Sequence, residues 1–502
     1  MAGIGFELKR MFAQKGLFAS IRAYSYAGII CAGPMVLGVA LLLGARLITG
    51  YAGASGHERE LLNSMITYAL LGSLTLTSLF SMATTRAIAD MLFTKQRERI
   101  MPTFYGSSAV MLVIGSIGYG TFLHFSGVPL LYKVLNLILF TTLVVVWTEI
   151  NYLTAVKDYK EILVTFFIAL LCALLLGAAL SIWVNIEPIA AMLIGIICGY
   201  GIMMVRYFLT LYKYFPEGKG SSLHFLRWFD KYPELSFVGF FLTLGLFGHL
   251  VIMWASKIGV QVEGLFYGAP AYDIPALIAF FSILITTVNF VTSVEVRFYP
   301  CYKDYFSLFN DKGSLEDIED AEKNMFVVLR EELIYLSQKQ LFSTVLFIVI
   351  GTLVLPYLEL GFNSDMLGTF RVLCVGYAFY AIANSIMLIE LYFADNKNSM
   401  KNSFFFMVIG NIFTILLMNG ASSFYGFGFL LGGAVFFLFS MIRLSMFLKR
   451  IKYHVLSCQP VFKSDTKGLF TPLCDRLDAR YERKHEQEKY SIKTTTGGRI
   501  NV

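Results

Sequence analysis

Charge is scarce in this chain of 502 residues: Asp, Glu, Lys and Arg make up 15% of it, while 57% is hydrophobic. A water-soluble domain needs a more polar surface, so the composition excludes a soluble globular protein. The seven cysteines and six histidines show neither the spacing of a zinc site nor a disulfide framework. We therefore expect no metal ion.

Catalytic sequence motifs are missing as well. The chain contains no Walker motif, no GxSxG and no pair of acids in a soluble segment large enough to form an active site. No basic stripe interleaved with stacking aromatics suggests nucleic-acid binding. We expect no enzymatic activity, no cofactor and no nucleic-acid partner.

Long apolar stretches are what the chain has instead. A membrane-spanning helix needs roughly 20 predominantly apolar residues, because every backbone polar group must be paired within the helix. About twelve stretches meet that requirement, and they predict an all-α integral membrane protein. They lie near residues 24–48, 61–92, 103–125, 131–155, 161–184, 188–213, 235–256, 271–298, 340–360, 366–394, 402–420 and 424–447.

The loops between these stretches carry Lys and Arg on alternate sides only. Because basic residues near span ends stay in the cytoplasm, the richer side predicts the cytoplasmic face and places both termini there. This bias also accounts for the net charge of +7. The richer side includes Lys9, Arg10, Lys95, Arg97, Arg99, Lys157, Lys160, Lys219, Arg227, Lys231, Lys397, Lys401, Lys449, Arg450 and Lys452, and the other side holds little beyond Arg59, Lys133 and Lys257.

The spans divide into two halves of about six around a polar linker, as in transporters built from parallel repeats. The fourth span ends near Glu149 and the tenth near Glu390, although independent use of charged helix ends would give the same echo. The expected parts are an amphipathic interfacial helix at 1–23, an N-lobe at 24–215, a linker at 216–234, a C-lobe at 235–450 with a helical cytoplasmic loop at 303–339, and a polar tail at 451–502.

Ionisable and polar residues within the spans are the functional candidates, since a charge at the bilayer centre costs roughly 2.5–3.5 kcal/mol on insertion scales. We expect them to line a central cavity or gate its cytoplasmic mouth; structural ion pairs and interfacial aromatics are the alternative interpretations. The pathway or gate candidates are Arg86, Glu149, Tyr152, Asn289, Glu295, Arg297, Asn384, Glu390 and Tyr392.

The opening string Met1 to Arg10, the Ala32-Gly-Pro34 step in the first span and the stretch Thr148 to Leu153 together resemble the PelG family of inner-membrane exopolysaccharide transporters. The resemblance covers about residues 1–450 and implies the multidrug/oligosaccharidyl-lipid/polysaccharide flippase fold, with two six-helix lobes in a V around a cavity. It also implies a bacterial inner-membrane location. The implied cargo is an N-acetylgalactosamine-rich polysaccharide, and the implied partners are a cytosolic glycosyltransferase and further inner-membrane Pel synthase subunits.

Three functions remain open at this point. The first is export of the polysaccharide or its precursor. The second is cation-coupled extrusion of small molecules, which the lack of any acid in residues 24–50 disfavours. The third is a membrane scaffold that recruits the synthase through the 303–339 loop and the N-terminal helix, with transport carried out by another protein.

Overall fold

The computed structural model describes residues 17–156, 158–216, 218–310, 313–358, 361–457 and 468–483. Within these residues, 11 helices are long and apolar enough to cross a membrane, and a shorter apolar stretch, Val36–Tyr51, lies in the first described helix. The predicted fold class, an α-helical integral membrane protein with about twelve spans, is confirmed.

The helices follow one another with short connections. In the first half they are α2 (Leu17–Tyr51), α3 (Gly56–Phe93), η1 (Arg97–Arg99), α4 (Ile100–Phe125), α5 (Leu130–Val156), α6 (Tyr159–Ala178), η2 (Ala179–Trp183) and α7 (Pro188–Tyr214). The connection between the halves contains η3 (His224–Leu226) and α8 (Arg227–Lys231). In the second half they are α9 (Pro233–Trp254), α10 (Pro270–Phe280), η4 (Phe281–Ile283), α11 (Leu284–Ser293), η5 (Val294–Phe298), α12 (Tyr299–Asn310), α13 (Leu315–Val354), η6 (Leu355–Tyr357), α14 (Ser364–Tyr392), α15 (Asn396–Leu417), η7 (Ser422–Phe424), α16 (Phe427–Leu448) and α17 (Ile451–Ser457).

The two halves repeat one pattern of helix pairing. In the first half α6 packs on α7, and α5 packs on α3 and α7; in the second half α15 packs on α16, and α14 packs on α10 and α16. Small residues allow the closest of these approaches. A Cβ at Gly195 would lie 2.6 Å from the Ala173 carbonyl oxygen, and one at Gly432 would lie 2.6 Å from the Cα of Gly410. The two halves therefore resemble each other in helix packing as well as in sequence.

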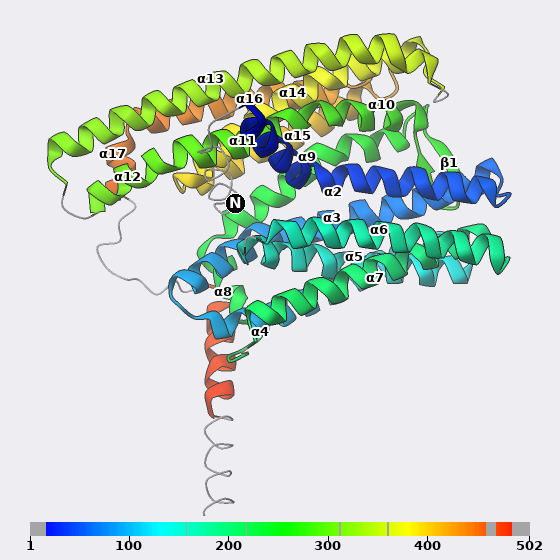
Figure 1. Ribbon diagram of the computed structural model, residues 1–502, viewed down its shortest axis with the longest axis horizontal. Helices are drawn as coiled ribbons and strands as arrows, with labels where there is room; N and C mark the ends of the chain where they lie inside the picture. The colour runs from blue at the N-terminus through cyan, green and yellow to red at the C-terminus, as the bar shows by residue number, and fades with distance from the viewer. Residues whose placement is uncertain are drawn as a thin grey trace, which may run out of the picture.

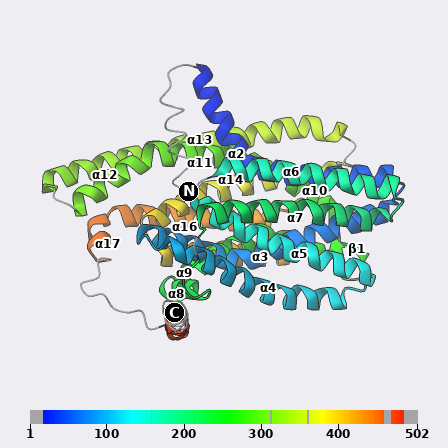
Figure 2. The same ribbon diagram turned by 60° about the horizontal axis from the view of Figure 1, so that its bottom comes forward.

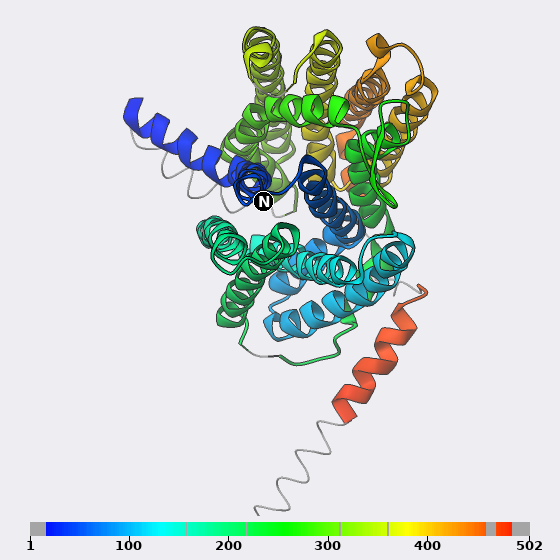
Figure 3. The same cartoon turned by 90° about the vertical axis from the view of Figure 1, so that its right-hand side faces the viewer.

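We call helices α2 to α7 the N-lobe and α9 to α16 the C-lobe. Helices α4 to α7 occupy one side of the molecule and α10 to α16 the other (Figure 1), and a view from the end of the molecule shows the same division (Figure 3). The lobes meet where α3 packs on α9 and where α2 packs on α11. We call these two contacts the seams between the lobes.

One element departs from the all-helical expectation. The strands β1 (Val260–Glu263) and β2 (Phe266–Gly268) form an antiparallel hairpin between α9 and α10. We call the end of the molecule that carries this hairpin the hairpin end. The opposite end carries α8, α12 and α17 (Figure 1), and we call it the linker end.

The long connection predicted at 303–339 is helical throughout most of its length. Ser314 followed three residues later by Asp317 predicts a capping box at the start of a helix. The structure contains it, with Ser314 Oγ accepting a hydrogen bond from the Asp317 backbone N–H at 3.1 Å. From there α13 runs 40 residues without a break, so the loop helix and the ninth span are one element. Helices α12 and α13 project together at the linker end (Figure 2).

The two terminal predictions are only partly covered. Most of the expected interfacial helix at 1–23 lies outside the described residues. In the polar tail, the residue pattern of 473–490 predicts a short exposed helix. The structure has a helix over residues 471–483, and the residues from 484 onward lie outside the described part.

Candidate functional site

Arg86 lies on the N-lobe side of the α3–α9 seam. Its side chain is half exposed, and its Nε lies 3.1 Å from Asp90 Oδ1 one turn further along α3. The guanidinium also sits 5.3 Å from the centroid of the Tyr232 ring, at the start of α9. This candidate is thus a solvent-reachable cation where the two lobes meet near the linker end.

Arg297 occupies the corresponding region of the C-lobe, in the π-helical turn η5. Its Nη1 lies 2.6 Å from Glu332 Oε1 on α13, and its side chain is 65% exposed while that of Glu332 is 4% exposed. Glu332 also accepts a hydrogen bond from Ser293. Glu295 stands on the same turn. The exposed Arg297 is thus paired with a buried acid, Glu332. Glu332 lies in the predicted helical loop and was not among the candidates predicted from the sequence.

Glu390 is buried near the linker-end terminus of α14 and is 1% exposed. Asn402 Nδ2 donates to its carboxylate at 3.2 Å and Ser399 Oγ at 3.3 Å, both from α15. Close by, Arg443 Nε on α16 lies 2.5 Å from Asp395 Oδ2. Glu390 therefore belongs to a polar network that joins three C-lobe helices.

Glu149 occupies the equivalent position in the N-lobe and is also 1% exposed. Among the described residues, its Oε2 has no hydrogen-bond partner. Tyr152, one turn further on, is buried and lies 3.2 Å from the Ser107 hydroxyl. The nearby ion pair between Arg206 and Glu161 at 2.6 Å parallels that between Arg443 and Asp395, so the echo between the halves includes their charged residues.

The structure does not bring Glu149 and Glu390 together, because each lies inside its own lobe. Asn289 is buried on α11, the C-lobe helix that packs on α2. Asn384 is partly exposed on α14, and the Tyr392 carbonyl accepts a hydrogen bond from the Tyr302 hydroxyl at 2.9 Å. Their roles in a substrate pathway stay predictions.

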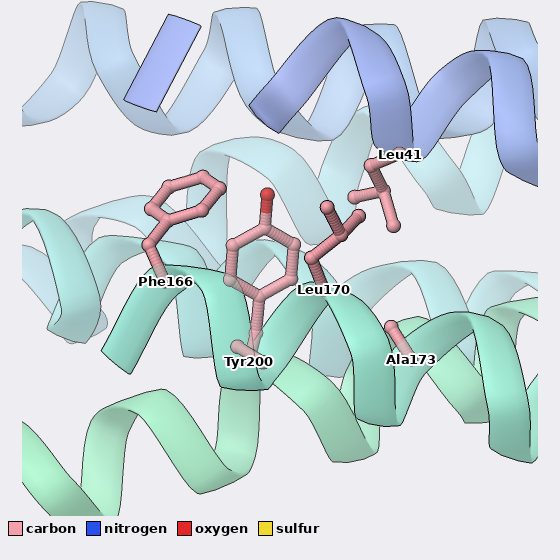
Figure 4. Close-up of a pocket in the computed structure, with 6 residues that line it drawn as sticks. Leu41, Phe166, Leu170, Ala173 and Tyr200 are labelled. Atoms are coloured by element: carbon pink, nitrogen blue, oxygen red, sulfur yellow. The ribbon is translucent and has the colours of Figure 1, made fainter. Parts of the chain in front are cut away.

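A small cavity lies within the N-lobe, between α2, α6 and α7 (Figure 4). It is lined by Leu41, Phe166, Ala169, Leu170, Ala173 and Tyr200. The Tyr200 hydroxyl points toward α2 and is the polar group that Figure 4 shows there. The apolar lining suits neither a charged nor a strongly hydrated ligand.

The arrangement of the helices in two similar lobes is shared with known membrane transporters. The chain superposes on a MOP superfamily transporter from Pyrococcus furiosus with a TM-score of 0.52 at 12% identity, covering 85% of this chain and 96% of that one. It also matches an outward-facing MATE family multidrug resistance transporter with a TM-score of 0.54 at 14% identity, covering 84% and 96%. A MATE structure in a straight conformation gives 0.54 at 13% identity, covering 85% and 96%. The chain therefore shares its fold with these transporters.

The sequence then defines the family within this class. Residues 1–456 match the PelG exopolysaccharide exporter family (EPS-E), and the chain belongs to it. No curated protein matches the sequence. The predicted resemblance is thereby confirmed, and the protein is a multi-pass membrane transporter.

Proposed function

We propose that this transporter exports a Pel-like, N-acetylgalactosamine-rich exopolysaccharide, or its lipid-linked precursor, from the cytoplasm to the periplasm. The observation that carries the proposal is the repeated six-helix packing around two seams, in a chain that matches the exporter family over residues 1–456. Transporters of repeated architecture place their substrate path at the interface between the repeats. Arg86 lies at that interface, beside Tyr232 at the start of α9, and Arg297 is its counterpart on the C-lobe.

We further propose that the linker end faces the cytoplasm of a bacterial inner membrane. The basic loops gather at this end, as the positive-inside rule requires of a cytoplasmic face. They include Lys95, Arg97, Arg99, Lys219, Arg227, Lys231, Lys397, Lys401, Lys449, Arg450 and Lys452. Arg59, Lys133 and Lys257 lie at the hairpin end, which then faces the periplasm.

The proposed partners are a cytosolic glycosyltransferase and the other inner-membrane subunits of a Pel synthase. The projecting helices α12 and α13 support a docking role, because they extend beyond the membrane-spanning bundle at the proposed cytoplasmic end (Figure 2). Exposed residues on α13, including Leu315 and Val327, offer apolar contacts beside its acids. Polymer made by such an enzyme would enter the transporter at this end.

The test is complementation of a strain that lacks the gene, with secreted polymer measured by an antibody or lectin against the sugar. We expect the parent chain to restore secretion and Arg86→Ala combined with Arg297→Ala to reduce it at least several-fold, with the synthase complex still co-purifying. Lys401→Ala, an exposed basic residue at the same end, is the control and should secrete normally. Normal secretion by the double variant would favour a scaffold, and secretion without any copy of the chain would overturn the proposal.

A further inference from the structure

One side chain of the N-lobe binds both backbone groups of a residue in the C-lobe hairpin. The Tyr68 hydroxyl on α3 accepts a hydrogen bond from the Tyr267 N–H at 3.0 Å and donates one to the Tyr267 carbonyl at 3.1 Å. The Tyr68 ring stacks on Trp254 of α9, with centroids 4.7 Å apart and planes 15° apart. Tyr68 therefore holds the hairpin to the N-lobe through both ring stacking and specific hydrogen bonds.

A second contact joins the two backbones directly. The Leu265 N–H donates to the carbonyl of Ser126, at the end of α4, at 2.9 Å. The preceding Gly264 has a φ of +57°, and a Cβ there would lie 1.8 Å from the Ser126 carbonyl oxygen. Only glycine satisfies both the backbone conformation and the close approach.

A third pair lies at the solvent-exposed rim of the same interface. His57 Nε2 at the start of α3 lies 3.7 Å from Glu263 Oε2 of β1, with side chains 59% and 33% exposed. Such an exposed pair adds little stability. It does show that three separate N-lobe segments, near His57, Tyr68 and Ser126, contact one hairpin.

The linker end is arranged differently. There the N-lobe contacts the start of α9 and the linker, as in the hydrogen bond from Trp228 Nε1 to Asp90 Oδ2 at 2.9 Å. Helices α12 and α4 lie apart from each other in both side views (Figures 1 and 2). A β-hairpin thus joins the lobes at the hairpin end. At the linker end, the described contacts between the lobes come from helices and the linker.

We propose that the β1–β2 hairpin is a latch that closes the hairpin end of the transporter. Opening at that end requires Tyr68 to release Tyr267 and Ser126 to release Leu265, so that the lobes separate there. The structure is the latched state. The consequence for polymer release rests on the proposed function, whereas the separation of the lobes can be measured without any cargo.

Spin labels can measure that separation in the full chain in nanodiscs. Labels at Leu130→Cys in the N-lobe and Val260→Cys in β1, both exposed in the structure, would be placed in a background without the native cysteines. We expect one short distance in the parent. Loss of two hydrogen bonds in Tyr68→Phe should raise the ratio of separated to latched molecules roughly tenfold.

Gly264→Ala provides a second variant with a matched control. The added methyl group should push the Ser126 backbone away and populate a longer distance between the labels. Gly53 also has a positive φ, +84°, but a Cβ there meets nothing within 4 Å, so Gly53→Ala carries the same backbone strain without touching the hairpin. Identical distance distributions for Gly264→Ala and Gly53→Ala, with Tyr68→Phe unchanged from the parent, would overturn the latch.

Cross-linking then connects the latch to export. In cells, His57→Cys with Glu263→Cys would be joined by a short, reducible thiosulfonate reagent, and His124→Cys with Lys133→Cys, two N-lobe positions at the same end, serves as the same-lobe control. We expect secretion to stop in the first pair only and to recover with a reductant. Full secretion with the cross-link formed overturns the latch and leaves the proposed function standing. Secretion in the strain without the gene overturns the function, and the spin-label distances then still decide the latch.

Discussion

Asp230 of the linker caps the tail helix through Thr471. Its Oδ2 accepts hydrogen bonds from the Thr471 backbone N–H at 2.6 Å and from the Thr471 hydroxyl at 2.7 Å, and also from the Phe470 N–H at 2.9 Å. A carboxylate in this position satisfies N–H groups that have no partner within the helix. The tail helix, residues 471–483, which lies beyond the residues matched to the family, is therefore anchored by specific contacts.

Asp230→Ala should release the tail helix from the linker. Loss of an N-terminal cap costs about 1–2 kcal/mol, and the docked segment is short, so we expect a clear increase in mobility. The measurement is the spectrum of a spin label at Arg480→Cys, an exposed tail position. The control is Asp475→Ala, whose side chain is 59% exposed and pairs only at the surface with Arg227, and an equal effect of both substitutions would contradict the capping role.

Acidic pH should destabilise the folded region around His224, on which the tail helix is docked. Burial lowers the pKa of His224 below its ordinary value of 6.5; Asp478, whose Oδ2 lies 2.9 Å from Nδ1, opposes the shift, and Arg99 and Arg227 add to it. Because the histidine of the unfolded chain binds protons more readily, the folded region around His224 is fully stable above about pH 6.5 and loses stability as the pH falls below that value.

The label at Arg480→Cys should accordingly become more mobile between pH 7.5 and pH 5.5. His224→Gln removes the titrating group, so its spectrum should change less over the same range. A spectrum of the parent that does not respond to pH would refute the coupling.

The two equivalent ion pairs should differ in their contribution to stability. Arg443 and Asp395 have side chains 20% and 9% exposed, whereas Arg206 and Glu161 are 37% and 31% exposed. Removing one partner of a fully buried pair costs 3–5 kcal/mol, so we expect about 2–3 kcal/mol for Arg443→Ala and under about 1 kcal/mol for Arg206→Ala. Thermal unfolding in detergent measures both, and the reverse order would show that exposure does not govern these pairs.

Substitution of the two buried glutamates should separate a structural role from a functional one. Glu390→Ala leaves the Asn402 and Ser399 donors without their acceptor and should cost about 1–3 kcal/mol, while Glu390→Gln keeps an acceptor oxygen and should cost less. Glu149→Gln should leave the melting temperature unchanged, because the Glu149 Oε2 has no hydrogen-bond partner to lose among the residues that the structure describes. If Glu149 serves the transport path, the same substitution reduces secretion; unchanged secretion removes it from the gate candidates.

Several features were readable from the chain because their causes are local. Spans follow from runs of apolar residues, and the capping box at Ser314 follows from residue spacing within one turn. The equivalence of Glu149 and Glu390 was likewise visible in the sequence. The hairpin was missed since Val260 to Gly268 is short and its strands gain stability from contacts with Tyr68 and Ser126, which are far away in the sequence.

The sequence by itself determined that the chain is an α-helical membrane protein in two similar halves. Both the insertion of an apolar helix and the side on which a basic loop stays depend on residues that are neighbours in the chain. Only the tertiary structure decided that Arg297 pairs with Glu332 and that Tyr68 holds the hairpin. It also decided that, within the described part of the chain, Glu390 is hydrogen-bonded while the Glu149 Oε2 is not. Partner choice depends on which helices lie side by side, and helix packing in a membrane is set by close contacts between distant small residues such as Gly195 and Ala173. The hydropathy of a segment does not indicate which other helix it contacts.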